Sequence, residues 1–214
     1  MAIAFDWEAR WALDAPDHPG EIDYGALIPR WHAALHRQQI LVDLVHPAAD
    51  LSGYDLIIAP HLYLLGDEAA ANLTGFVNDG GHLLLAAFAD VVDEHDAFRE
   101  GGFQVGLREV LGVTVEEFGA LVPPAVAAGG TSAGDTTGSV LAAGGPGENH
   151  ADVDLDGRTV RGEFFAEQLQ ILDPEVETIA RFCSGRLTGE PALTSKRAGR
   201  GRAHYLATIP DDEG

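Results

Sequence analysis

The sequence has little positive charge, one cysteine and no long hydrophobic run. Its 214 residues hold a single lysine, Lys196, against 34 acidic side chains, and the formal net charge at pH 7 is −21. A chain this acidic repels nucleic acid and anionic membrane surfaces, so we exclude both as partners. The one cysteine, Cys183, excludes an internal disulfide and predicts a cytoplasmic protein. No segment approaches the roughly 20 consecutive apolar residues that cross a membrane.

The most regular segment runs from Tyr54 to Phe88 and predicts a strand, a helix and a second strand. Leu56 to Ala59 is a continuous apolar run, and residues 67–79 place apolar side chains at helical spacing. Leu83 to Phe88 is again apolar throughout. Apolar runs on both sides of an amphipathic helix are typical of parallel strands that are buried on both faces.

The same alternation of strands and helices extends over the first half of the chain. It predicts four parallel strands, and a helix over residues 24–38 between the first two. The predicted strands are residues 2–5, 40–45, 55–60 and 82–88. This pattern predicts an α/β fold with a doubly wound, mostly parallel sheet.

The chain is expected to form one domain over residues 1–214, with one unusual segment. Residues 119–150 are dominated by Gly, Ala, Pro, Ser and Thr and have few large apolar side chains. Such a composition buries little surface, so we expect a mobile loop there. From Asp152 to Ala207, short alternating runs separated by glycine-containing turns predict further strands.

The second apolar run, from Leu83 to Phe88, ends without a nucleophile. In hydrolases and amidotransferases of this architecture, the nucleophile lies on a sharp turn directly after such a strand. The residues here are Ala86, Ala87, Phe88 and Ala89, none of which can attack a substrate. We therefore expect no catalytic residue in this chain.

Three other patterns suggest chemistry but lack the context that it requires. Ser132 lies in a G-x-S-x-G pattern inside the glycine-rich segment, not between a strand and a helix. His32 and His36 have the spacing of zinc ligands without a general-base glutamate, so we expect them on a helix surface. Cys183 is expected to be a buried strand residue. No G-x-G-x-x-G motif and no P-loop is present, and we expect neither a metal nor a cofactor.

Polar residues follow two of the predicted strands at their carboxyl ends. Open α/β sheets usually bind ligands at this edge. Among them, the segment from Asp93 to Asp96, which we call the acidic loop, is a candidate for contacting a divalent metal or a sugar, or else for contacting another domain or subunit. The six candidates for a crevice or an interface are His61, Tyr63, Asp93, Glu94, His95 and Asp96.

Several short segments, taken together, resemble a known family. The segments are Phe5 to Glu8, Val42 to Pro47, Asp50 to Asp55, Ala59 to Tyr63, Phe76 to Gly81, Val91 to Asp96, Gly101 to Phe103 and Leu107 to Gly112. In order and spacing they are similar to the middle, trimerisation domain of bacterial β-galactosidases of glycoside hydrolase family 42. The resemblance covers nearly the whole chain and is densest from residue 40 to residue 118.

The resemblance implies a flavodoxin-like fold, akin to class I glutamine amidotransferases but without their catalytic cysteine. It implies that a separate (β/α)8 barrel hydrolyses terminal β-galactosides, and that the parent enzyme is a homotrimer. Neither that barrel nor the small C-terminal β domain of the family fits into these 214 residues. The chain is therefore expected to be a non-catalytic assembly domain that contacts the barrel of its own polypeptide.

Two alternative functions stay open on the sequence alone. One is a degenerate amidotransferase-like domain that binds a small ligand, such as a sugar, in the crevice beside His61 and Asp93. The other is an independent hydrolase, which requires Ser132 or Cys183 to lie beside a histidine.

Overall fold

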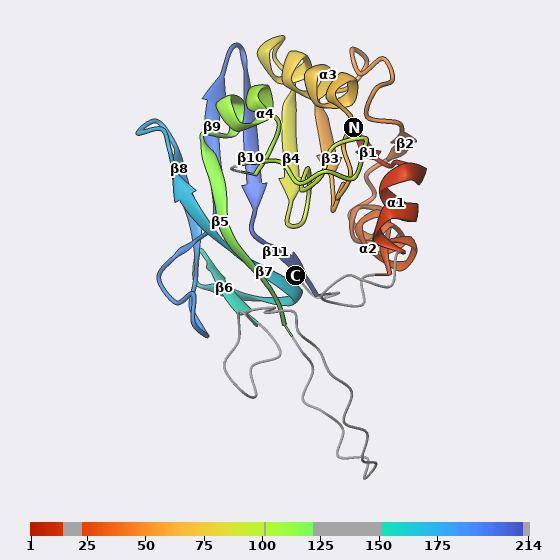
Figure 1. Cartoon of the computed structure of the whole chain (residues 1–214). Helices are drawn as coiled ribbons and strands as arrows, with labels where there is room; N and C mark the ends of the chain where they lie inside the picture. The colour runs from red at the N-terminus through yellow and green to blue at the C-terminus, as the bar shows by residue number, and fades with distance from the viewer. Residues whose placement is uncertain (15–22, 101, 122–150, 212–214) are drawn as a thin grey trace, which may run out of the picture.

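The computed structural model describes residues 1–14, 23–100, 102–121 and 151–211. Within them, eleven strands form one mixed sheet that is accompanied by four helices (Figure 1). The helices are α1 (Trp7–Leu13), α2 (Tyr24–Arg37), α3 (Asp67–Asn78) and α4 (Val105–Leu111). None of the helices in this described part is long and apolar enough to cross a membrane.

Five strands form a parallel half of the sheet. In order across the sheet they are β10 (Gly201–Leu206), β4 (His82–Ala86), β3 (Leu56–Ala59), β1 (Ala2–Ala4) and β2 (Asp43–Val45). The side chains of Ile57, Leu83 and Leu85 are fully buried, as their continuous apolar runs predict. The four strands predicted in the first half of the chain do pair with one another in parallel.

Six strands form an antiparallel half. They are β5 (Val113–Ala120), β6 (Ala151–Leu155), β7 (Arg158–Ile171), β8 (Glu177–Phe182), β9 (Pro191–Ala198) and β11 (Thr208–Pro210). β9 joins the halves because it pairs with β10, and the order continues through β8 and β6 to β7. β7 changes partner along its length: Arg158–Gly162 pairs with β6, and Phe165–Ile171 pairs with β5.

Tight turns connect β6 to β7 and β9 to β10, whereas helices lie along the chain between β1 and β2 and between β3 and β4. Asp156 and Gly157, with φ angles of 53° and 81°, form the turn between β6 and β7. Asp-Gly is the dipeptide that most readily adopts two successive positive φ angles in a hairpin. Gly199, with a φ of 56°, lies in the turn between β9 and β10.

The predicted fold class is wrong. A flavodoxin-like or amidotransferase-like, doubly wound sheet is mostly parallel, whereas six of the ten strand pairings in the described residues are antiparallel. The prediction gave too much weight to the first half of the chain. The strands after residue 151 follow one another without an intervening helix, and successive strands joined by tight turns must run antiparallel.

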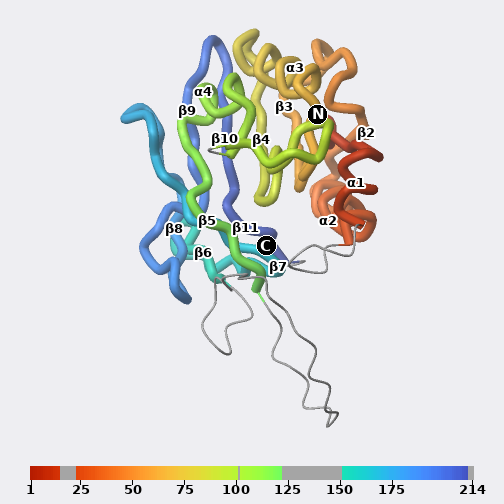
Figure 2. Tube along the Cα trace, viewed as in Figure 1, coloured from red at the N-terminus to blue at the C-terminus, as the bar shows by residue number. Residues whose placement is uncertain are grey.

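The helices leave the two faces of the sheet unequally covered. Leu83 and Leu85 point to the face where α3 and α4 contact β4 and β10. Leu84 points to the opposite face, where it lines a hollow together with Trp31 of α2. α1 and α2 contact each other and lie together, away from α3 and α4 (Figure 2).

Side chains that precede α1 and α2 cap the first turns of these two helices. Asp6 accepts a hydrogen bond from the backbone of Glu8 at 2.8 Å at the start of α1. Asp23 accepts from Ala26 at 3.0 Å at the start of α2. These bonds pair backbone N–H groups that would otherwise lack a partner inside the helix.

An aromatic cluster fills the seam between the parallel and antiparallel halves. The ring of Phe88, directly after β4, stacks on Phe165 of β7 with 4.5 Å between centroids. Tyr63 stacks on Phe88 at 5.1 Å, and Phe118 of β5 meets it edge-on at 5.3 Å. Side chains from both halves thus share one continuous core.

Candidate functional site

His61 lies at the carboxyl end of β3 and is fully buried. Its Nδ1 lies 2.7 Å from the carbonyl oxygen of Ala87, so Nδ1 donates and Nε2 is free to accept. Nε2 does accept, at 3.3 Å, from the indole Nε1 of Trp31. Burial lowers the pKa of His61 to about 4, so the ring is neutral at pH 7. The ring therefore joins α2 to the turn after β4.

Phe88 occupies the turn after β4 where a nucleophile would lie in a hydrolase. Its φ angle is 63°, in the left-handed region that non-glycine residues adopt at a cost in energy. The side chain is buried against Phe165 and Tyr63, and a phenyl ring has no atom that can attack a substrate. The strained turn is present in this fold, but its side chain belongs to the core.

Glu167 on β7 is a buried carboxyl group that the sequence did not lead us to expect. Its Oε1 accepts from the backbone N–H of Phe88 at 2.8 Å, and its Oε2 from the hydroxyl of Tyr205 at 2.5 Å. Burial raises the pKa of Glu167 to about 7 and raises the pKa of Tyr205 well above its usual value. The only signal for this site was an acidic residue within the largely apolar segment from Phe164 to Ile171.

Asp90 is a second buried carboxyl group, and its partners fix the loop after β4. Arg99 Nε donates to its Oδ1 at 2.6 Å, and the backbone of Gln104 donates to its Oδ2 at 2.5 Å. Burial raises the pKa of Asp90 to about 7, although the hydrogen bond from Gln104 and the charge of Arg99 both act to lower it. Arg99 also donates to the carbonyl of Leu65 at 2.6 Å and to Asp67 at 3.0 Å.

The predicted acidic loop lies on the surface, held by its own hydrogen bonds. Asp93 Oδ1 accepts from the backbones of His95 at 2.8 Å and Ala97 at 3.0 Å, and these bonds hold the pKa of Asp93 below its usual value. Glu94 accepts from the backbone of Asp67 at 3.3 Å, at the start of α3. In the described residues, no group of three or more His, Cys, Asp and Glu side chains is placed to hold a metal ion.

The six predicted residues are neighbours, but they do not face one shared cavity. Val91 donates to the carbonyl of Tyr63 at 2.9 Å, which fastens the acidic loop beside the end of β3. The side chains of His61 and Tyr63 point into the core, where they are 0% and 5% exposed. Glu94, His95 and Asp96 are exposed. A partner that contacts this edge would therefore meet the loop, with His61 and Tyr63 supporting it from below.

The other predicted residues have mixed outcomes. His32 and His36 lie on the exposed surface of α2 with ring centroids 6.0 Å apart, as predicted. Cys183 is exposed, so its predicted burial is wrong. Partial desolvation and two neighbouring carboxylates raise the pKa of its thiol, which keeps it out of the reactive thiolate form. Ser132 lies outside the described residues.

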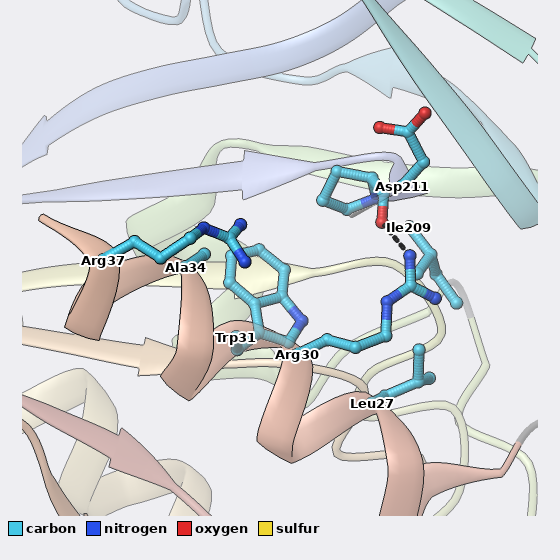
Figure 3. A pocket seen from close by; sticks show the side chains of 8 residues that line it. Leu27, Arg30, Trp31, Ala34, Arg37, Ile209 and Asp211 are labelled. Atoms are coloured by element: carbon cyan, nitrogen blue, oxygen red, sulfur yellow. Dashed lines mark hydrogen bonds between the residues drawn. The ribbon is translucent and has the colours of Figure 1, made fainter. Parts of the chain in front are cut away.

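Two hollows lie beside α2. The smaller one is lined by Arg30, Trp31 and the end of β11, and encloses about 60 Å³ (Figure 3). Arg30 bridges it by donating to the carbonyl of Pro210 at 3.0 Å.

The larger hollow is an apolar groove on the sheet face opposite α3 and α4. It encloses about 410 Å³ and lies between α2 and strands of both halves of the sheet. The residues that line it include no Asp, Glu, Lys or Arg. Its walls and floor include Trp31, Leu56, Leu84, Val153, Leu193 and Leu206, and we call it the sheet groove.

Comparison with known proteins gives a consistent result. A family model described as "Beta-galactosidase trimerisation domain" matches residues 1–214. A β-galactosidase of Arthrobacter sp. is 36% identical over 214 residues, covering 100% of this chain and 27% of the relative. The β-galactosidase BgaA of Planococcus sp. is 33% identical over 216 residues, covering 100% of this chain and 29% of the relative.

A solved structure agrees with these sequence matches. It is a catalytic mutant of Gan42B, a GH42 β-galactosidase from G. stearothermophilus, with a TM-score of 0.83 and 27% sequence identity. The match covers 99% of this chain and 28% of that one. The chain thus spans less than a third of the length of these proteins.

Proposed function

We propose that this chain, which belongs to the β-galactosidase trimerisation domain family, holds three copies of a longer β-galactosidase together and performs no catalysis itself. The observation that carries the proposal is the family match over residues 1–214, together with 36% identity to a β-galactosidase over the whole chain. In this proposal the parent enzyme hydrolyses terminal β-galactosides in a (β/α)8 barrel outside these 214 residues, and this chain contacts that barrel.

The turn after β4 supports a role without catalysis. Phe88 fills the position from which a nucleophile would act, and its ring is buried in the seam. The buried carboxyl groups of Glu167 and Asp90 are bonded to Phe88, Tyr205 and Arg99 inside the protein. All these groups contribute to holding the two halves and the loop after β4 in place.

That the acidic loop forms part of the interface stays a prediction. Glu94, His95 and Asp96 are exposed and available to a neighbouring subunit or domain. Asp93 fixes the loop conformation that presents them, because its carboxylate is hydrogen-bonded to two backbone N–H groups. The proposal further places the assembly in the cytoplasm, which the single free Cys183 supports.

Sedimentation velocity over a range of concentrations, together with a β-galactoside hydrolysis assay, tests this function. We expect a species that gains mass with concentration up to three chains, and no hydrolysis above the rate in buffer. Hydrolysis that survives purification would contradict the non-catalytic role. A monomer at every concentration would contradict the assembly role of these 214 residues.

A further inference from the structure

The sheet groove is an uncharged concavity on a strongly acidic protein. The chain carries a net charge of −21, so two copies repel each other over most of their surfaces. The groove lining has no carboxylate and no permanent cation. Its one titratable side chain is His204, whose pKa is lowered by burial, so it is neutral at pH 7. Like-charged copies can approach here without burying an unpaired charge.

A cyclic trimer needs two different contact surfaces on each copy. Only a two-fold interface uses the same surface twice, whereas a three-fold ring is closed by head-to-tail contacts. A groove that receives a neighbouring copy must therefore be matched by a protruding surface elsewhere on the same chain. That surface must be apolar, because the groove offers no polar side chain beyond His204 and Thr208.

The exposed face of α1 carries two large apolar side chains. Arg10 lies over the ring of Trp7, with its guanidinium carbon 5.3 Å from the centroid, and its charge is paired with Asp14 at 3.8 Å. Trp7 and Trp11 are 55% and 65% exposed, and their ring centroids lie 6.4 Å apart. Phe5 supports Trp7 edge-on at 5.0 Å, which limits the freedom that the indole would lose on binding. Tryptophan is among the residues that contribute most at interfaces, because its large ring buries much apolar surface. We call these two side chains the indole pair.

The groove can accept both rings of such a pair. The groove has a volume of about 410 Å³ and extends from Trp31 of α2 to Val153 of β6. On the floor, Leu84 of β4 is the register partner of His204 on β10, and Leu206 lies two positions further along β10. A stable interface buries roughly 800 Å² on each partner, so the groove would be its centre and not its whole area.

We infer that the sheet groove of one copy receives the indole pair of the next copy, so that head-to-tail repetition closes the trimer. This inference rests on the self-association proposed above and names the two surfaces that produce it. The partner is a second copy of this chain, held mainly by burial of apolar surface.

Native mass spectrometry of matched variants tests the inference. Leu84→Glu places a charge on the groove floor, and its control Leu172→Glu places the same charge on a leucine that is 51% exposed outside the groove. Removal of both indoles, by Trp7→Ala with Trp11→Ala, is controlled by Leu41→Ala, which removes an apolar side chain that is 91% exposed outside α1 and the groove. We expect a threefold fall in mass for the groove variant and for the indole variant, and no change for the two controls.

Mixing the two defective variants gives the sharpest result. The groove variant still carries an intact indole pair, and the indole variant still carries an intact groove. An equimolar mixture should therefore form a complex of two chains, one of each kind, through the single intact contact. Two monomers that do not combine would overturn the head-to-tail contact.

The outcomes separate this inference from the function on which it rests. A monomeric wild-type chain would overturn both. A trimeric wild type whose groove variant or indole variant stays trimeric would overturn only the inference. Circular dichroism checks that Leu84→Glu folds, and Leu84→Gln, which keeps the side-chain length without the charge, replaces it if it does not. A trimer of Leu84→Gln with unchanged concentration dependence would then overturn the groove contact.

Discussion

The parallel and antiparallel halves of the sheet differ in how their faces are covered. In the parallel half, helices lie along the chain between β1 and β2 and between β3 and β4, and Leu83 and Leu85 are fully buried on the face that α3 and α4 contact. In the antiparallel half, tight turns connect the strands, and the groove-side residues Val160 and Leu193 stay half-buried. Helices therefore close the face of the parallel half that carries Leu83 and Leu85, whereas on the opposite face strands of both halves form an apolar surface that is open to a partner.

The N-terminal and C-terminal parts of the chain also differ in charge. Residues 1–157 hold five of the thirteen basic side chains, whereas the last 57 residues hold eight. Arg202, Arg186 and Lys196 of this C-terminal part form ion pairs of 2.8–3.0 Å with acidic residues. The C-terminal part of the chain is therefore closer to neutral, which favours contact with an acidic neighbour there.

Loss of the aromatic packing at the seam between the halves should have the largest effect on the free energy of unfolding. Phe165 is fully buried and stacks on Phe88 across the two halves. We expect Phe165→Ala to lower the free energy of unfolding by about 3–5 kcal/mol, measured by urea denaturation. Phe98→Ala, at a ring that is 72% exposed, should change it little. Equal effects of the two variants would mean that the halves do not depend on a shared core.

The buried carboxyl group at the seam should make stability depend on pH. The pKa of Glu167 is raised by burial from 4.5 to about 7, so the folded state holds its proton where the unfolded state has lost it. Its contribution to stability is therefore full below about pH 4.5 and is lost as the pH rises to about 7. At about 1.4 kcal/mol for each pKa unit, the loss is of the order of 3 kcal/mol.

Comparison with Glu167→Gln isolates this effect. The pKa of His61 is lowered to about 4 by burial, so His61 adds stability as the pH rises over the same window and offsets Glu167 in the wild type. Asp90, with a pKa raised by burial to about 7, acts in the same direction as Glu167. Both are present in the variant, so their effects cancel in the difference. The variant should gain stability relative to wild type from pH 4.5 to pH 7, and a constant difference would contradict this account.

Loss of the positive charge of Arg99, in the loop after β4, should lower the stability of the parallel half by a smaller amount. Arg99→Met removes the hydrogen bonds to buried Asp90 and to the carbonyl of Leu65. We expect a loss of about 1–3 kcal/mol in the free energy of unfolding, because a buried acceptor loses its partner. Arg200→Met, at an exposed ion pair with Asp79, is the matched control and should have little effect. Thermal denaturation of both variants measures the difference.

Changes in the exposed acidic loop should have the smallest effect. His95→Ala removes a side chain on the surface and should leave thermal unfolding unchanged. If the loop forms the rim of the interface, this variant should weaken self-association by roughly two- to fivefold, because exposed polar contacts contribute little. An unchanged concentration dependence in sedimentation would remove the loop from the interface.

The sequence predicts the parallel half well because local patterns determine it. Continuous apolar runs such as Leu56 to Ala59 can be buried only when both faces of a strand are covered, and the helix over 67–79 connects two of them. Most strands after residue 151 were recognised individually, β11 excepted, but the antiparallel dominance in the sheet was not predicted. Pairings such as that of β5 with β7, separated by the segment over 122–150, depend on contacts that no local pattern encodes.

The site was harder to predict because tertiary packing decides which of its side chains are buried and which are exposed. His61 and Tyr63 follow a strand as expected, yet their side chains turn into the core. Glu167 and Tyr205 lie 38 positions apart and meet only because β7 and β10 reach the same seam. The sheet groove likewise combines Trp31, Leu84 and Val153, from three distant segments, so no spacing rule could have found it.

The molar mass of the chain, measured by size-exclusion chromatography with light scattering, decides whether these residues assemble on their own. A value near three times 22.6 kDa is the result that we predict, because it would place a sufficient assembly surface within these 214 residues. A value that stays at 22.6 kDa at every concentration loaded would contradict the claim that this chain alone holds the copies together.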